Sequence, residues 1–165
     1  MNGETKETGF YADIKRKLKQ INGARIDIGW FEESQYLRRK ILNKKIDVPL
    51  KEPIPMGRVA FWLDKGTRHI RERPFLSIIL IEHRVKYAEL SRSIAFECLE
   101  GRRTVKESLK RIGSVIEGDL KLKITDIRTP PNSPEWEKIK GFNNPLILNG
   151  WLKANAKFKL RKIRV

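Results

Sequence analysis

Apolar positions recur along the chain with two periods, and together they predict a mixture of helices and short strands. Near the start, an apolar side chain returns every three or four residues with Lys and Arg between, and Asn22-Gly23 ends this predicted helix. The recurring side chains are Tyr11, Ile14, Leu18 and Ile21. Residues 24–31 then alternate between apolar and polar, which is typical of a half-buried strand.

Helical spacing resumes in the middle of the chain. Residues 56–65 predict a helix that stops at Gly66, and a long helix is predicted to open at Pro74 and to end at Gly101. Thr104 and Glu107 form a capping-box pattern for the next helix. Its apolar stripe is the most regular in the sequence and consists of Val105, Leu109, Ile112, Ile116 and Leu120. Two consecutive helices with a brief break predict an antiparallel hairpin.

Two segments depart from these regular patterns. Residues 34–55 read as a basic, proline-rich excursion, since three prolines in its last seven residues favour extended backbone. Residues 128–165 read as a C-terminal module of loop, short helix and basic strand. In this module Ser133 is a good N-cap, Pro134 suits the first helical position, and Gly141 stops the helix. The closing run 156–165 alternates apolar and basic side chains, with a change of phase after residue 162 that a bulge allows.

These elements predict a single domain over residues 1–165 of the α+β class. The expected architecture is a small antiparallel sheet packed against a long helical hairpin, with extended loops or arms. Cys98 is the only cysteine, so no internal disulfide is possible, and its helical context predicts a buried thiol. The most hydrophobic run, 75–81, is too short to span a bilayer, and no membrane partner is expected.

Charge narrows the possible partners without choosing among them. The chain has 36 Lys and Arg against 20 Asp and Glu, a formal net charge of +16. Such a surface is explained by solubility alone, by a polyanion such as nucleic acid, or by an acidic protein surface. The basic side chains gather at 15–19, 38–45 and 153–164.

Catalytic and cofactor-binding patterns are not recognisable in the sequence. Cys98, His69 and His83 are too few for a zinc-type site, and neither histidine lies in a recognisable nucleophile–base context. The glycines are scattered singly, without a phosphate-cradling run. The sequence therefore predicts no enzyme, no metal site and no cofactor.

Two longer stretches resemble a known family. The first is "GRVAFWLDKGTRHIRERPFL" at 57–76, and the second is "PPNSPEWEKIKGFNNPLILNGWL" at 130–152. With "IDIGWF" and the helix hairpin, their order resembles the virion-morphogenesis family of tailed bacteriophages, which comprises neck and tail-completion proteins. The resemblance covers residues 26–159. Asp64-Lys65 stands before Gly66 where the family often has Glu and an aromatic residue, and the insert 49–55 does not align.

The resemblance implies a structural virion protein at the phage head–tail junction, made in the host cytoplasm. Such a neck, tail-completion or terminator protein forms a ring with itself, with a hexamer favoured and a dodecamer possible. The ring joins the connector to the tail and lets DNA pass, so neighbouring connector and tail proteins are the expected partners and DNA in the channel a possible one. The alternative is a small basic nucleic-acid-binding protein.

The candidate interface combines basic positions with the apolar anchors of the second stretch. For the apolar group, contact with a partner and capping of the subunit's own core are equally good interpretations. For the basic residues in 38–45, a free loop is the alternative to a contact arm. For those in the C-terminal strand, the alternatives are an edge strand protected against aggregation by its lysines and a strand that pairs with a neighbouring subunit. The candidate residues are Arg38, Arg39, Lys44, Lys45, Trp136, Phe142, Pro145, Leu146, Ile147, Lys157, Lys159 and Arg161.

Overall fold

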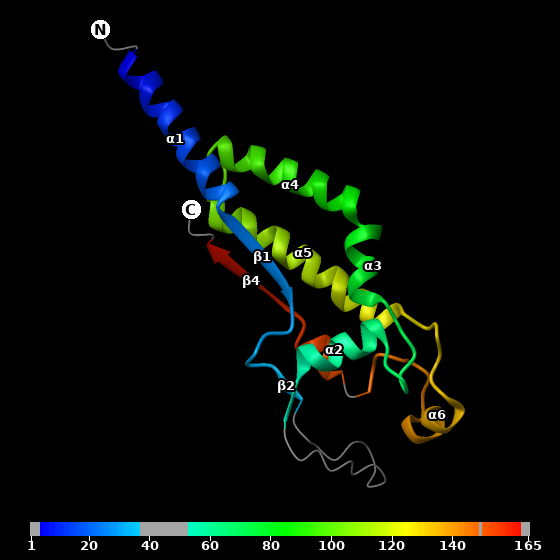
Figure 1. The fold of residues 1–165 in the computed structure, drawn as a ribbon. Helices are drawn as coiled ribbons and strands as arrows, with labels where there is room; N and C mark the ends of the chain where they lie inside the picture. Colours follow the sequence, from blue (N-terminus) through cyan, green and yellow to red (C-terminus); the bar gives the residue numbers. More distant parts are fainter. Residues whose placement is uncertain (1–3, 37–52, 149, 163–165) are drawn as a thin grey trace. The chain divides into compact units, whose positions relative to one another are not determined.

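The computed structural model describes residues 4–36, 53–148 and 150–162, and this part of the chain has the predicted α+β composition (Figure 1). Helices dominate, and the strands are short. The elements in chain order are α1 (Glu4–Asn22), β1 (Ala24–Gly29), β2 (Gln35–Tyr36), β3 (Ile54–Pro55), α2 (Met56–Lys65), α3 (Phe75–Glu82), α4 (Arg84–Leu99), α5 (Val105–Asp126), α6 (Pro134–Lys140), α7 (Trp151–Ala154) and β4 (Lys157–Lys162).

The prediction of one long helix after Pro74 is wrong in one respect, because this segment forms two helices. Backbone angles of φ −102° and ψ 14° at His83 leave the helical region, so α3 ends at Glu82 and α4 begins at Arg84. The apolar spacing runs through the break unchanged, which is why the sequence pattern did not reveal it.

The chain divides into two compact units, each assembled from separated segments. Unit 1 is formed from 1–27, 83–116 and 158–165, and unit 2 from 28–82 and 117–157. The helix α5 contributes its first half to unit 1 and its second half to unit 2.

Unit 1 contains the two-stranded pairing of β1 with β4, which run in opposite directions (Figure 1). Asp27 ties the strands together, since its carboxylate accepts a hydrogen bond from Arg25 Nε at 2.6 Å and pairs with Arg161 Nε at 2.7 Å. On α4, Ile94 and Cys98 are buried, which confirms the predicted buried thiol.

Gly113 allows the strand β4 to lie close to α5. A Cβ atom at Gly113 would come within 2.3 Å of Cδ2 of the Phe158 ring, whereas a Cβ at Gly118 on the same helix would meet nothing within 4 Å. The ring of Phe158 therefore occupies the space that a side chain at residue 113 would need. A two-stranded sheet is only marginally stable alone, so this packing against α5 is what supports it.

We expect Gly113→Ala to destabilise the protein by about 2 kcal/mol, because the clash with Phe158 exceeds the gain of roughly 1 kcal/mol in helix propensity. Gly118→Ala is the matched control and should stabilise by about 1 kcal/mol, since it gains the same propensity without a clash. Urea unfolding followed by helical circular dichroism measures both. Equal stabilisation by the two substitutions would contradict the packing of Phe158 on Gly113.

The core of unit 2 joins α2, α3, the second half of α5 and the segment after Pro145. Trp30 helps to close it, with its ring edge-to-face on Phe75 at 5.9 Å and its Nε1 donating to Leu152 O at 2.8 Å. The buried members of this core are Met56, Ala60, Phe75, Ile79, Leu120, Ile124, Leu146, Leu152 and Ala156.

A short ladder of β2 with β3 brings the two ends of the proline-rich excursion together. It is antiparallel, with Gln35 opposite Pro55 and Tyr36 opposite Ile54. Ser34, just before the ladder, is buried, and its carbonyl accepts from the amide of Met56 at 2.9 Å. Residues 37–52, with the predicted interface residues Arg38, Arg39, Lys44 and Lys45, lie outside the described residues.

Candidate functional site

Asp64 is a buried carboxylate that holds the start of α3. The helix begins without a side-chain acceptor of its own, and Asp64 Oδ1 accepts from the amides of Leu76 at 2.7 Å and Ser77 at 3.2 Å. The hydroxyl of Ser77 donates to the other carboxylate oxygen. A negative charge at this end of a helix satisfies free amides and complements the helix dipole. Asp64 thereby fixes α3 to α2.

The pKa of Asp64 lies below its usual value. Burial alone would raise this pKa, but the hydrogen bonds from Ser77 and Leu76, with Lys65 at 3.3 Å, outweigh burial. Because the pKa of Asp64 is lower in the folded state, its ionised form stabilises the fold. This stabilisation is fully present above the pKa of the unfolded chain, near 4, and is lost as the pH falls through the lower pKa of the folded state.

We expect Asp64→Asn to cost about 1.5 kcal/mol at neutral pH, because an amide accepts at one oxygen only and carries no charge. The exposed Glu72→Gln in the neighbouring loop is the control and should change little. The difference between the two variants should shrink as the pH falls below about 4 toward the lowered pKa at which folded Asp64 takes up a proton. Urea unfolding at neutral and acid pH measures this, and a difference that grows on acidification would contradict it.

Arg73 joins the two stretches that carry the family resemblance. Its side chain is only 7% exposed. Nε donates to Pro130 O at 2.8 Å and Nη2 to Pro131 O at 3.0 Å. A planar guanidinium suits two neighbouring carbonyls, since its donors form a fixed fork. One side chain of the first stretch therefore fixes the backbone at the start of the second.

Lys140 places a second buried cation beside Arg73. Its Nζ donates to the carbonyl of Asn144 and lies 4.8 Å from the centroid of the Phe142 ring. The side chain is 7% exposed. Burial, and then the positive charge of Arg73, lower the pKa of Lys140 to about 8. Both cations are held mainly by backbone carbonyls, so they fix the shape of the loop at a desolvation cost.

Asparagines complete the polar network of the second stretch. Asn143 accepts at its side-chain oxygen from the amide of Asn132 at 3.2 Å, and the side-chain NH₂ of Asn144 donates to Thr125 O at 2.9 Å. Ser133 caps α6 by accepting from the amide of Trp136 at 3.2 Å, and Gly141 ends α6 in the left-handed conformation, as predicted. The stretch is thus internally braced and tied to α5.

The structure separates the predicted apolar interface residues into two groups. Pro145 and Leu146 are buried, and Leu146 belongs to the core of unit 2, against which Ile147 is packed. Trp136 is half-buried, and Phe142 is 37% exposed. Of this set, Trp136 and Phe142 offer the surface that a partner can reach.

The predicted basic strand exists as β4, with Lys157 and Arg161 exposed and Lys159 half-buried. Arg161 is the cross-strand partner of Asp27, so one of its roles lies within unit 1.

Sequence reasoning missed Asp64, Arg73 and Lys140 as the residues that organise unit 2. One signal was available for Asp64, because it follows Met56 and Ala60 at spacings of four and so shares their buried helix face. Arg73 and Lys140 had no comparable local signal, since their acceptors lie in other segments or around a turn.

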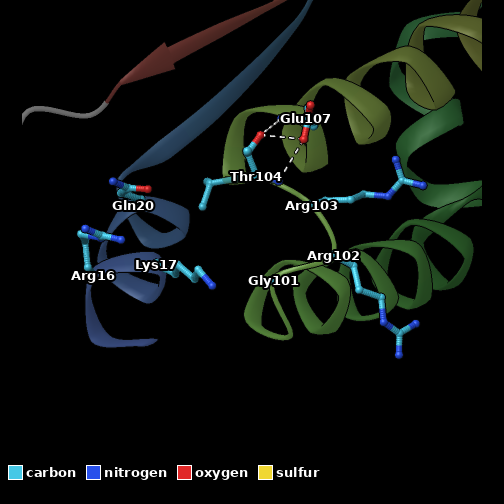
Figure 2. A pocket seen from close by; sticks show the side chains of 9 residues that line it. Arg16, Lys17, Gln20, Gly101, Arg102, Arg103, Thr104 and Glu107 are labelled. Atoms are coloured by element: carbon cyan, nitrogen blue, oxygen red, sulfur yellow. Dashed lines mark hydrogen bonds between the residues drawn. The ribbon is translucent and has the colours of Figure 1, made fainter. Parts of the chain in front are cut away.

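Unit 1 has a hollow of about 430 Å³ between the last turns of α1 and the start of α5 (Figure 2). Its lining is rich in basic side chains and comprises Arg16, Lys17, Gln20, Gly101, Arg102, Arg103, Thr104, Val105 and Glu107. At the start of α5 the predicted capping box is confirmed. Thr104 N and Oγ1 donate to Glu107 Oε2 at 3.0 and 2.8 Å, and Glu107 N donates back to Thr104 Oγ1 at 3.3 Å.

Carboxylates compensate the charges of this hollow. Lys17 Nζ lies 2.9 Å from Asp13, Arg102 lies 2.7 Å from Glu100, and Arg103 Nε lies 2.6 Å from Glu97. Figure 2 shows the guanidinium groups of Arg102 and Arg103 directed away from Lys17. The hollow is therefore basic in composition, but its positive groups do not converge on one point where a phosphate would bind.

Among the described residues, no three His, Cys, Asp or Glu side chains come together as a metal-ligand set. No helix in that part of the chain has the length and apolar character needed to cross a membrane. Comparison with known protein families, with curated proteins and with solved structures finds no match to the chain.

Proposed function

We propose that the chain is a structural protein of a tailed-phage virion, located at the head–tail junction, where copies of it form a neck, tail-completion or terminator ring between connector and tail. The observation that carries the proposal is the pair of hydrogen bonds from Arg73 to Pro130 and Pro131. The two stretches that resemble the phage family are far apart in sequence, yet they form one braced element. Their contact supports the interpretation that the two stretches belong to one functional element.

Exposed apolar side chains in unit 2 agree with a protein that is covered by neighbours. In α3, Ile81 is 76% exposed and Leu80 is 55% exposed, directly after the fully buried Ile79. A short helix that is apolar on all sides suits a buried position, so its open face favours contact with another protein. A ring provides such contacts repeatedly, through one surface meeting a different one on the next copy.

Deletion of the gene from the phage or prophage that encodes it tests the location. Filled heads and finished tails lying apart in electron micrographs are the expected result. Intact, joined particles would contradict the proposal. Complementation with the wild-type gene should restore joined particles and exclude an effect on neighbouring genes.

We expect Trp136→Ala and Phe142→Ala to weaken assembly more than folding, because both side chains lie on the braced second stretch and have accessible ring surface. Preformed loops lose little entropy on docking, so truncation should remove contact energy directly. Leu146→Ala is the control for folding, since a buried leucine in the core costs about 2–5 kcal/mol when truncated. Complementation of the deletion and thermal unfolding measure the two properties. Equal losses of folding in all three variants would place Trp136 and Phe142 in the subunit's own core.

A small nucleic-acid-binding protein is the second candidate, supported by the net charge of +16 and the exposed Lys157 and Arg161. It predicts DNA binding by the isolated protein that weakens steeply with salt, because each phosphate contact releases counterions. The compensated charges of the unit 1 hollow count against it.

A further inference from the structure

The helix α1 carries an apolar seam with the spacing of a coiled coil. Tyr11, Ile14, Leu18 and Ile21 follow one another at intervals of three, four and three residues. Within unit 1 the seam is incompletely covered, since Tyr11 is 76% exposed and Leu18 is 42% exposed. Phe10, beside the seam, is 65% exposed. A helix with two neighbouring aromatic side chains in water presents a surface for a partner.

The uncovered part of the seam is accessible in unit 1. The helix α1 contacts α4, and its N-terminal half runs beyond the end of α4 (Figure 1). Asp13 pairs with Lys17 at 2.9 Å and with Arg16, on the side of the helix away from Tyr11. These intrahelical pairs leave the seam itself open.

Charge is divided along α1 and indicates what covers the seam. Residues 4–13 contain three acidic residues and one basic residue, whereas residues 14–22 contain four basic residues and no acidic one. Two such helices side by side in the same direction would place like charges together. Running in opposite directions, they would place the acidic start of each along the basic end of the other. Charges flanking an apolar seam set the orientation of helix pairs in this manner.

We propose that two copies of the chain pair antiparallel through α1, with Tyr11 of one copy against Leu18 of the other. The contact is two-fold and closed, so it stops at a dimer, and it uses residues of unit 1 alone. A membrane surface is a weaker match, because a helix lying on lipid carries Lys and Arg throughout its polar face, whereas α1 concentrates them at one end.

Sedimentation equilibrium of the full chain over a wide concentration range tests the pairing. Wild type is expected to dimerise, and Tyr11→Glu should weaken dimerisation by about a hundredfold or more, since it buries a charge in the seam. Phe61→Glu is the matched control, an exposed aromatic residue on α2 that is 61% exposed, and it should dimerise like wild type. Circular dichroism should show equal helix content in all three. A wild-type monomer at every concentration, or equal dimerisation of Tyr11→Glu, would overturn the proposal.

The direction of pairing has its own test. In a mixture of Tyr11→Cys and Leu18→Cys chains, oxidation should cross-link the two kinds to each other, while Tyr11→Cys alone should cross-link poorly. The native Cys98 is buried and does not compete. Efficient cross-linking of Tyr11→Cys to itself would overturn the antiparallel arrangement. Binding of monomeric wild type to anionic lipid vesicles that Tyr11→Glu abolishes would overturn it in favour of a membrane surface. None of these outcomes depends on where the protein lies in a virion, which the gene deletion tests separately.

Discussion

Arg73→Met is expected to destabilise unit 2 by about 4 kcal/mol. The substitution removes charge-assisted hydrogen bonds to Pro130 O and Pro131 O and leaves both carbonyls without their donor. The substitution also removes the desolvation cost of the buried guanidinium, but this gain offsets only part of the loss. All four tryptophans belong to unit 2, so urea unfolding followed by tryptophan fluorescence reports this unit alone.

Two further variants sharpen the result. Arg73→Lys should recover little of the loss, because a single ammonium cannot bridge two neighbouring carbonyls in one plane. Arg71→Met removes an exposed arginine two residues away and should stay within about 0.5 kcal/mol of wild type. If Arg73→Lys were as stable as wild type, the positive charge and not the fork of donors would be the important property.

Lys140→Met is expected to stabilise the protein at pH 7 by about 1–2 kcal/mol, in the opposite direction to most substitutions of buried residues. Lowering the pKa of Lys140 from 10.5 to about 8 corresponds to a cost of roughly 3 kcal/mol for keeping the ammonium charged in the folded state. Lys140→Met removes this cost, but it also removes the hydrogen bond to Asn144 O, and the loss of that bond offsets part of the stabilisation.

The pH dependence gives this prediction its sign. Between about pH 8 and 10.5 the unfolded chain retains the proton on Lys140 more strongly than the folded chain, so wild-type stability should rise with pH by roughly 3 kcal/mol from this group. Lys140→Met should lack this rise. Lys138 is an exposed lysine on the same helix, so Lys138→Met should keep the rise. Subtracting the stability profiles of the two variants removes the contributions of the titrating groups that they share. Identical pH profiles for both would contradict the burial of a charged Lys140.

The two substitutions should also be coupled. Because the charge of Arg73 contributes to the low pKa of Lys140, Arg73→Met should raise that pKa and flatten the profile above pH 8. Stability changes of neighbouring residues in one polar network are not additive, and the double variant measures the interaction directly.

Local signals in the sequence were sufficient for most helices of the fold. The capping box at Thr104 and Glu107, the N-cap Ser133 and the stop at Gly141 each act through neighbours a few residues away, and all three are present in the structure. The break at His83 was missed because the apolar spacing continues across it. Periodicity records which face is apolar, and it is insensitive to a single residue with a different ψ angle.

The braced element of unit 2 was beyond sequence patterns for a different reason. Arg73 and its acceptors are separated by 57 and 58 residues, and no periodicity relates such positions. The run Pro145 to Leu148 was open to two interpretations, because a core anchor and a contact anchor are equally apolar. Burial distinguishes them, since Leu146 lies inside the core and Ile147 is packed against it, whereas Phe142 is exposed.

The pairing of Tyr36 with Ile54 has a practical consequence for labelling the protein. Because the ladder places Tyr36 opposite Ile54, the chain returns to the place where it left the frame of unit 2. The entropic cost of closing an added flexible insert grows only with the logarithm of its length. A small fluorescent or affinity module can therefore be spliced between these ends, and it would mark the position of each copy in an assembled particle while both chain termini stay native.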